Sequence, residues 1–516
     1  MTDGAQGLPV ARTLTAAQRV VSLLAVVAIA IAIVNLRDAA SGLQITRSRV
    51  GDTPVTVFRP ASGAPAPVVV IAHGFAGSQQ LMQPFALTLA RNGYLAVTFD
   101  FLGHGRHPVP MRGDITEGTG ITAALLKQLG EVAGYAKTLQ GSDGRLAVLG
   151  HSMASDIVVR YAQANPEVQA TVAVSVFSPV ATATSPRNLL VIVGAWEPAM
   201  LRDEGLRIVG LAADGTAVAG EAYGDFNAGT ARKLVVASAV EHIGVLYSRD
   251  SLMAAREWLD RTFGRSGGGF VDSRGVSLAL LFAGLIALAW PLSALLPRAT
   301  QMPVGAGLGW RSLLLAAFVP ALLTPLMLWK LPTNFLPILL GDYLALHFLL
   351  YGALTAAMLL WLRTPMPSAA ASKRAVATAA LAVAAYNIIA FGWPIDTYVF
   401  SFSPIPARWP VMAAIACGAL PYFVADEWLT RGARARGAYG LTKFAFLLSL
   451  AIAVALNPMK LFFLAIIVPA ILLLFLAFGL ISRWCYRATN HPLPGALANA
   501  AFFAWAIAVT FPMVVR

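Results

Sequence analysis

The hydrophobic and polar positions divide the chain into stretches of different texture. Val20 to Leu36 is an almost wholly apolar run. From Gln44 to about Arg265, short apolar runs of strand length alternate with segments in which apolar residues recur at helical spacing. From Val276 onward the chain is a succession of apolar runs, most of them long enough to cross a bilayer. We therefore expect an N-terminal segment over 1–19, an apolar anchor over 20–36, a globular domain over 44–265 and a membrane domain over 276–516.

The globular stretch predicts an α/β fold. Its strand candidates are 53–58, 67–72, 94–99, 145–149, 170–177, 188–193 and 233–239. Its helical patterns lie near 80–92, 120–139, 153–163, 199–211 and 249–263. Because strands and helices alternate, we expect one mostly parallel sheet with helices on both faces. A stretch of this length is the size of one domain.

The C-terminal stretch predicts an all-α membrane domain of about eight helices. Its apolar runs are 276–297, 312–329, 336–362, 375–393, 409–425, 441–458, 461–482 and 495–515. The run over 20–36 adds a ninth span. This first run could instead be a cleaved signal peptide, because the residues before it are basic. Its length and the lack of a small-residue cleavage site favour an uncleaved anchor.

The charges support this division. Of 38 Lys and Arg and 25 Asp and Glu residues, the basic excess lies almost wholly outside the globular stretch. With a cytoplasmic N-terminus, thirteen Lys and Arg residues fall in inside segments and four in outside segments. This bias predicts a bacterial inner-membrane protein with its globular domain on the outer, periplasmic face. The basic charge therefore does not indicate nucleic acid, and the two cysteines, Cys417 and Cys485, lie outside the globular domain.

One strand end in the globular domain carries candidate chemistry. The apolar run Leu146–Leu149 stops abruptly at Gly150-His151-Ser152-Met153-Ala154, and a helical pattern follows. A serine at such a strand–turn–helix junction has its hydroxyl pushed clear of the sheet, as a nucleophile requires. The pattern differs from G-x-S-x-G only in Ala154, which replaces the last glycine.

Two further strand ends complete a resemblance. His73-Gly74 follows the strand 67–72, and Asp100-Phe101-Leu102-Gly103-His104-Gly105 follows the strand 95–99. With the Ser152 motif, these stretches resemble the α/β-hydrolase family of serine aminopeptidases and esterases in content, order and spacing. The resemblance covers about 44–265. It implies that an acid and then a histidine follow the nucleophile along the chain.

The resemblance places these partners at Glu197 and His242. Glu197 follows the strand 189–193, and His242 follows the strand 234–240, just before the last helix of the domain. Aspartate is the commoner acid at this position, and Asp203 or Asp225 could serve instead.

The roles follow from the chemistry of acyl transfer. His242 would take the proton of Ser152, and Glu197 would hold the imidazole in the right tautomer. The backbone N–H groups of Phe75 and Met153 are the expected donors of the oxyanion hole. No cofactor and no metal ion is expected.

The predicted function is that of a membrane-bound serine hydrolase, namely an esterase, lipase or thioesterase. The same three residues could also act in a peptidase. About ten residues separate the strand after Ser152 from the Glu197 strand, too few for the helical cap of many relatives. The site is therefore expected to be open, and apolar spans precede and follow the domain. Both features favour an acyl or lipid-like substrate, with membrane lipid as a partner. An acyltransferase with the same triad is an alternative. So is a transporter or receptor-like protein whose hydrolase domain only binds.

Several polar residues lie within or beside the predicted spans. Tyr343, His347 and Tyr351 share one helix face, with Asp342, Asn387 and Asp396 in or beside the same and the next span. Ionisable groups inside a bilayer often mark a transport path. We favour the simpler interpretation, a hydrogen-bonded network between helices.

Overall fold

The computed structural model describes residues 13–112, 120–213, 215–266, 268–367, 371–432 and 435–515. Its Cα positions over these residues divide the chain into two compact units. The first, here called the sheet unit, comprises Ile31–Ala279, Pro394–Ile405 and Val509–Arg516. The second, the helical unit, comprises Met1–Ala30, Leu280–Trp393 and Pro406–Ala508. Two short segments from the C-terminal half of the chain therefore belong to the sheet unit.

The described residues of the sheet unit form a nine-stranded sheet in the order β1-β2-β4-β3-β6-β7-β8-β10-β9. The strands are β1 (Leu43–Val50), β2 (Thr53–Pro60), β3 (Ala66–Ala72), β4 (Leu95–Phe99), β6 (Ser142–His151), β7 (Val168–Val174), β8 (Leu189–Gly194), β9 (Ala222–Tyr223) and β10 (Arg232–Ala237). From β4 to β10 neighbouring strands are parallel, whereas β1, β2 and β9 pair antiparallel at the two edges. The predicted mostly parallel sheet is confirmed.

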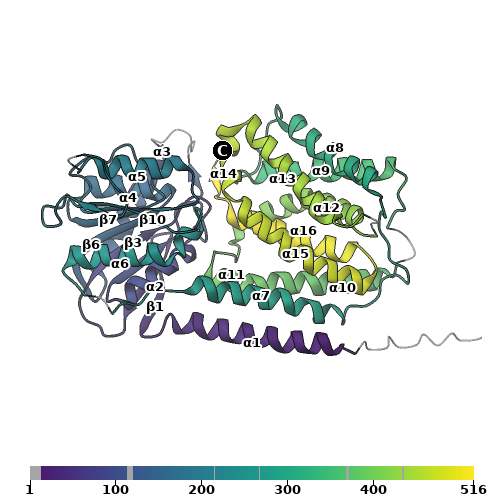
Figure 1. Ribbon diagram of the computed structural model, residues 1–516, viewed down its shortest axis with the longest axis horizontal. Helices are drawn as coiled ribbons and strands as arrows, with labels where there is room; N and C mark the ends of the chain where they lie inside the picture. Colours follow the sequence, from purple (N-terminus) through teal and green to yellow (C-terminus); the bar gives the residue numbers. More distant parts are fainter. Residues whose placement is uncertain are drawn as a thin grey trace, which may run out of the picture. The chain divides into compact units, whose positions relative to one another are not determined.

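Helices cover both faces of this sheet (Figure 1). One face packs against α2 (Gln83–Arg91) and α6 (Arg249–Phe263), and the other against α3 (Gly120–Thr138), α4 (Met153–Ala164) and α5 (Ala199–Gly210). The central strands are buried on both sides and therefore appear in the sequence as continuous apolar runs. The sequence prediction missed β1, because this edge strand is polar and mostly exposed.

The carboxyl ends of the parallel strands lie along one edge of the sheet. In α/β folds, ligands bind in the crevice outside this edge. The segments after β3, β6, β8 and β10 carry Phe75, Ser152, Glu197 and His242 respectively. The fold thus brings the predicted site residues to one edge, although up to 167 positions separate them along the chain.

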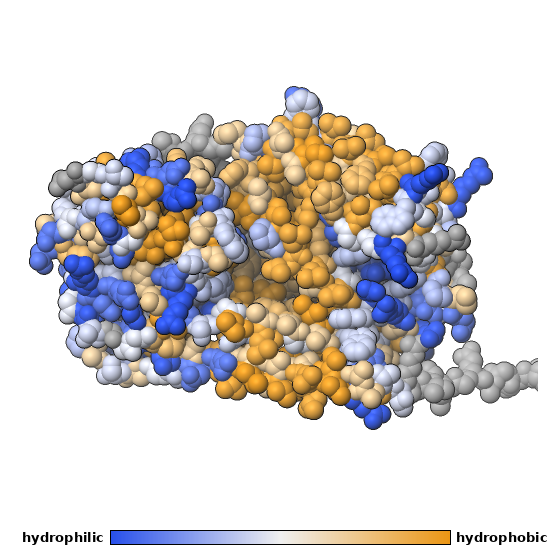
Figure 2. Space-filling view, viewed as in Figure 1, coloured by the Kyte–Doolittle hydropathy of each residue, from blue (hydrophilic) through white to orange (hydrophobic). Residues whose placement is uncertain are grey.

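The helical unit consists of long apolar helices. Over the described residues, nine helices are long and apolar enough to cross a membrane, as judged by length and composition. They are α1 (Ala16–Asp38), α7 (Arg274–Ser293), α8 (Trp310–Leu328), α9 (Gly341–Trp361), α10 (Lys373–Ala385) with the π-helical η3 (Tyr386–Phe391) and α11 (Gly392–Tyr398), α12 (Trp409–Thr430), α13 (Ala438–Leu456), α15 (Val468–Thr489) and α16 (Leu493–Thr510). Figure 2 shows apolar side chains gathered over these helices and hydrophilic ones over the sheet unit.

Two of the expected apolar runs have different limits in the structure. The run predicted over 461–482 is divided between the short α14 (Pro458–Ile466) and α15, because Pro469 has no N–H with which to continue the first helix. The run predicted over 495–515 ends as a helix at Thr510. After it, β11 (Val514–Val515) pairs with β5 (Met111–Arg112) of the sheet unit.

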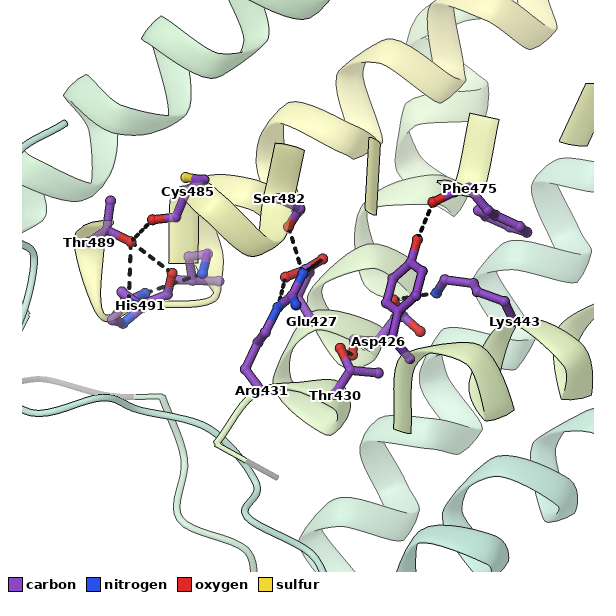
Figure 3. A network of polar contacts seen from close by, with 12 residues as sticks. Asp426, Glu427, Thr430, Arg431, Lys443, Phe475, Ser482, Cys485, Thr489 and His491 are labelled. Atoms are coloured by element: carbon purple, nitrogen blue, oxygen red, sulfur yellow. Dashed lines mark hydrogen bonds and ion pairs between the residues drawn. The ribbon is translucent and has the colours of Figure 1, made fainter. Parts of the chain in front are cut away.

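A buried network of charged side chains links three helices of the helical unit (Figure 3). Lys443 of α13 pairs with Asp426 of α12 at 2.5 Å, and Arg431 pairs with Glu427 at 2.7 Å and reaches Ser482 of α15 at 3.1 Å.

The network expected around His347 is only partly formed. The His347 Nε2 contacts Ser449 Oγ of α13 at 3.2 Å, and its Nδ1 lies 3.4 Å from the Tyr343 hydroxyl. In contrast, the buried side-chain amide of Asn387 in η3 has no hydrogen-bond partner among the described residues. Asp396 belongs to the sheet unit, where it pairs with Arg106.

Candidate active site

The Ser152 turn joins β6 to α4 in a strained conformation. Ser152 has φ +53° and ψ −119°, a region that L-residues rarely adopt and that costs about 1–3 kcal/mol. Its N–H donates to Val174 O of β7 at 2.8 Å, which anchors the turn to the sheet. A Cβ at Gly150 would overlap the carbonyl oxygen of Ala154, so the turn requires glycine there. Ala154 itself is wholly buried, and its methyl group fits where the usual motif has glycine.

The structure brings Ser152, His242 and Glu197 into one hydrogen-bonded chain. The His242 Nε2 lies 2.9 Å from Ser152 Oγ, and its Nδ1 lies 2.5 Å from Glu197 Oε1. A ring whose Nδ1–H donates to a carboxylate presents a bare Nε2, which is able to accept the serine proton. This arrangement has the geometry that a nucleophile, a base and an orienting acid require.

The Glu197 carboxylate is fully buried and held by donors on both oxygens. Its Oε2 accepts the Gly194 N–H at 2.6 Å and the Ser175 hydroxyl at 3.0 Å, while Oε1 faces His242. A buried carboxylate is stable only with such partners. The sequence analysis missed Ser175, which follows β7 with φ +56°. The sequence feature that could have identified Ser175 is a serine just after β7, the strand that pairs with β6.

The two alternative acids lie elsewhere. Asp203 is on an exposed face of α5, beside Arg202. Asp225 accepts the N–H of Ala228 in the loop before β10. The structure therefore places Glu197, and neither aspartate, against His242.

The loop after β3 lies beside Ser152. A Cβ at Gly74 would come within 2.9 Å of Ser152 Cβ, so the loop approaches as closely as glycine permits. Buried His73 holds the loop in place. Its Nδ1–H donates to Gly74 O at 2.8 Å, and its Nε2 accepts the Phe101 N–H at 3.0 Å. Burial lowers the pKa of His73, which keeps this ring neutral. Half-buried Phe75 follows in the loop, and half-buried Met153 starts α4.

A second histidine that the sequence analysis did not assign lies in the site. The Nε2–H of His151 donates to the carbonyl oxygen of His242 at 3.0 Å, and the two rings are 4.8 Å apart. The pKa of His151 is lowered well below 6.5, mainly because the ring is buried and secondly because the His242 ring is close. His151 is therefore a neutral donor that holds the backbone of His242.

Exposed apolar side chains lie close in the chain to the candidate site residues. Phe177 after β7 is 57% exposed, and Trp196 next to Glu197 is 70% exposed. Met200 and Ile243 are exposed as well, on α5 and beside His242. We call these four residues the apolar rim. The described residues 175–188 between β7 and β8 contain no helix, so no cap from this segment covers the rim. Clustered apolar side chains at a surface mark an interaction site.

No group of three or more His, Cys, Asp or Glu residues among those that the structure describes is placed to hold a metal ion.

Residues 63–202 match the family model described as serine aminopeptidase, S33. A crystal structure from Klebsiella pneumoniae subsp. pneumoniae MGH 78578, provisionally named a dienelactone hydrolase, is 18% identical, with a TM-score of 0.32. The match covers 43% of this chain and 99% of that one. A hypothetical protein from Pseudomonas aeruginosa is 10% identical, with a TM-score of 0.32, over 42% of this chain and 92% of that one. No curated protein matches the chain significantly.

Proposed function

We propose that the sheet unit is an α/β-hydrolase domain and that the chain is a membrane-bound serine hydrolase that cleaves an ester, thioester or amide through a Ser152 acyl-enzyme. The observation that carries the proposal is the hydrogen-bonded chain from Ser152 Oγ through His242 to Glu197. These three side chains follow three different strands of the sheet.

The reaction begins with attack of Ser152 Oγ on the acyl carbon. His242 Nε2 accepts the hydroxyl proton as the new C–O bond forms, and Glu197 stabilises the imidazolium. The Nε2–H then donates this proton to the departing alcohol, thiol or amine as its bond to the acyl carbon breaks. Water, deprotonated by the same nitrogen, then attacks the acyl carbon. The bond from this carbon to Ser152 Oγ breaks, Nε2–H returns the proton to Oγ, and the carboxylic acid leaves.

The negative oxygen of each tetrahedral intermediate needs fixed donors. The backbone N–H groups of Phe75 and Met153 are our candidates, because one lies in the loop against Ser152 and the other follows Ser152 directly. Removal of one such donor typically lowers the rate about a hundredfold or more.

We assign an acyl or lipid-like substrate on the basis of the apolar rim. Trp196 and Phe177 expose large apolar areas beside the strand ends that carry the triad, where an acyl chain would cover them. We expect Trp196→Ala to raise KM for octanoyl and decanoyl p-nitrophenyl esters about tenfold, while that for the acetyl ester changes less than twofold. Equal effects on short and long esters would contradict this assignment.

Labelling with a fluorophosphonate tests the serine hydrolase itself. The full chain in detergent should react covalently, and Ser152→Ala should abolish the labelling. Ser238→Ala is the matched control, because Ser238 is exposed on the turn leading to His242. A folded wild-type protein that does not react, or a Ser152→Ala variant that still does, would refute the proposal. A panel of esters, thioesters and aminoacyl amides would then separate esterase from peptidase activity.

We further propose that the sheet unit faces the periplasm from the bacterial inner membrane. The nine long apolar helices are compatible with a membrane protein, and the Lys and Arg bias supports this orientation. Protease added to intact spheroplasts should then digest the sheet unit. Protection in spheroplasts, with digestion only after lysis, would reverse the orientation.

A further inference from the structure

A cavity of about 150 Å³ lies within the sheet unit, apart from the triad. It is lined by both apolar and polar side chains. The apolar ones include Leu36, Phe58 and Leu87, and the polar ones include Arg47, Thr98 and Arg274. None of Ser152, Glu197 and His242 lines it.

Three arginines are among the residues that line the cavity. Arg274 is only 3% exposed, and its Nε and Nη1 are engaged by Asp272 and Gln83 at 2.5 and 2.6 Å. Arg106, which also lines the cavity, pairs with Asp396. Arg47 of β1 forms no ion pair with any residue that the structure describes. Asp272 and Asp396 therefore neutralise two of the three arginines. The positive charge of Arg47 is left for an anion.

Thr98 provides an independent sign of a ligand. Its side chain is wholly buried and lines the cavity, yet its Oγ1 has no hydrogen-bond partner in the described part of the chain. A buried hydroxyl left without a partner typically costs about 1–3 kcal/mol. An acceptor atom bound in the cavity would receive this hydroxyl proton.

The cavity lies where two candidate membrane helices end. Leu36 is in the last turn of α1, and Arg274 is the first residue of α7. Lipid headgroups occupy the boundary at which spanning helices leave the hydrocarbon. The small volume suits a headgroup rather than a whole drug-sized ligand, which needs roughly 300–1,000 Å³.

From these observations we infer that the cavity binds the phosphate-bearing headgroup of an anionic phospholipid. Arg47 and Arg274 hold the phosphate oxygens, and Thr98 donates its hydroxyl to the same group. Leu36 and Phe58 contact the first carbons of the glycerol and acyl region. The site is separate from the proposed hydrolase reaction and does not depend on it.

Native mass spectrometry of the full chain in detergent tests this site. The probes are phosphatidylglycerol and phosphatidylcholine with identical acyl chains. Both lipids carry the phosphate, but only phosphatidylcholine brings a trimethylammonium group next to the cationic arginines, so we expect one molecule of phosphatidylglycerol to bind about tenfold more tightly. Arg47→Gln should abolish this preference, because it removes the positive charge that has no carboxylate partner. Thr98→Val should weaken the binding of both lipids about tenfold, because it removes one donor to the phosphate.

The control is Arg49→Gln, which removes the same charge from the same strand at a residue that does not line the cavity. Thr98→Val keeps the side-chain shape, so unchanged lipid binding in this variant would show that no ligand accepts the Thr98 hydroxyl.

Three results would overturn the inference. The first is equal binding of the two lipids by the wild type. The second is an equal loss in Arg47→Gln and Arg49→Gln, which indicates general charge attraction. The third is displacement of phosphatidylglycerol by equimolar glycerol 3-phosphate, which assigns the cavity to soluble phosphate esters. Labelling by fluorophosphonate in the same samples shows separately whether the hydrolase site is intact.

Discussion

Replacement of Glu197 by glutamine tests the proposed acid without changing its size. In the wild type, Gly194 N–H and the Ser175 hydroxyl both donate to Oε2, and His242 Nδ1–H donates to Oε1. A glutamine has one carbonyl oxygen and one NH₂ group. The two donors on the Oε2 side hold the carbonyl oxygen there, so the NH₂ group must turn toward His242.

This rotation determines the tautomer of His242. An NH₂ group next to Nδ1 requires Nδ1 to accept, which moves the ring proton to Nε2. The Nε2 atom, 2.9 Å from Ser152 Oγ, then has no lone pair with which to take the serine proton. In a serine protease, the equivalent change lowers kcat about 10⁴-fold. We therefore expect Glu197→Gln to lower kcat/KM by about 10³- to 10⁴-fold, which corresponds to about 4–5.5 kcal/mol in activation free energy.

Hydrolysis of p-nitrophenyl butyrate by the full chain in detergent measures this effect. Asp203→Asn is the matched control, since Asp203 is the exposed acid that the sequence also offers. Thermal unfolding should show that both variants are folded. Activity of Glu197→Gln within tenfold of the wild type, or an equal loss in Asp203→Asn, would refute the reasoning.

Three other predictions follow from the same contacts. Ser175→Ala removes one donor to the buried carboxylate and should lower kcat about tenfold with little change in KM, as measured with the same ester. Lys443→Met leaves Asp426 buried without its cation and should destabilise the helical unit by about 3–5 kcal/mol, seen as a lower unfolding temperature in detergent. His151 is neutral in the folded protein but titrates near pH 6.5 when unfolded. Acid therefore favours the unfolded state. Between pH 7 and pH 5, the free energy of unfolding of the wild type should fall by up to about 2 kcal/mol more than that of His151→Gln.

The central strands and the nucleophile turn were predictable from the sequence for local reasons. A parallel strand buried on both faces is a continuous apolar run, as in Ala66–Ala72 and Leu189–Gly194. The turn at Ser152 needs small neighbours, which leave a recognisable pattern around Gly150. The polar edge strand Leu43–Val50 has no such pattern, because it is stabilised by its pairing with β2 rather than by burial of its own side chains.

Other features depend on residues far apart in the chain. Ser175 contacts Glu197, and His151 contacts His242, only because β6, β7, β8 and β10 are neighbours in the sheet. The assignment of the segment 394–405 to the sheet unit likewise follows from contacts such as Arg106 with Asp396, across 290 positions. A single sequence carries no periodicity that would reveal such pairs.

The sequence by itself determined the class of this protein: an α/β domain that resembles the α/β hydrolases, joined to long apolar helices, with a candidate nucleophile at Ser152. These features depend on residues that are close together in the sequence: the periodicity of apolar residues and the steric requirements of one turn. Only the tertiary structure decided which carboxylate faces His242, which side chains hold that carboxylate, and that Thr98 and Arg274 line one cavity. The reason is that hydrogen bonds and cavities depend on distances in space, and strand order, not sequence order, sets those distances.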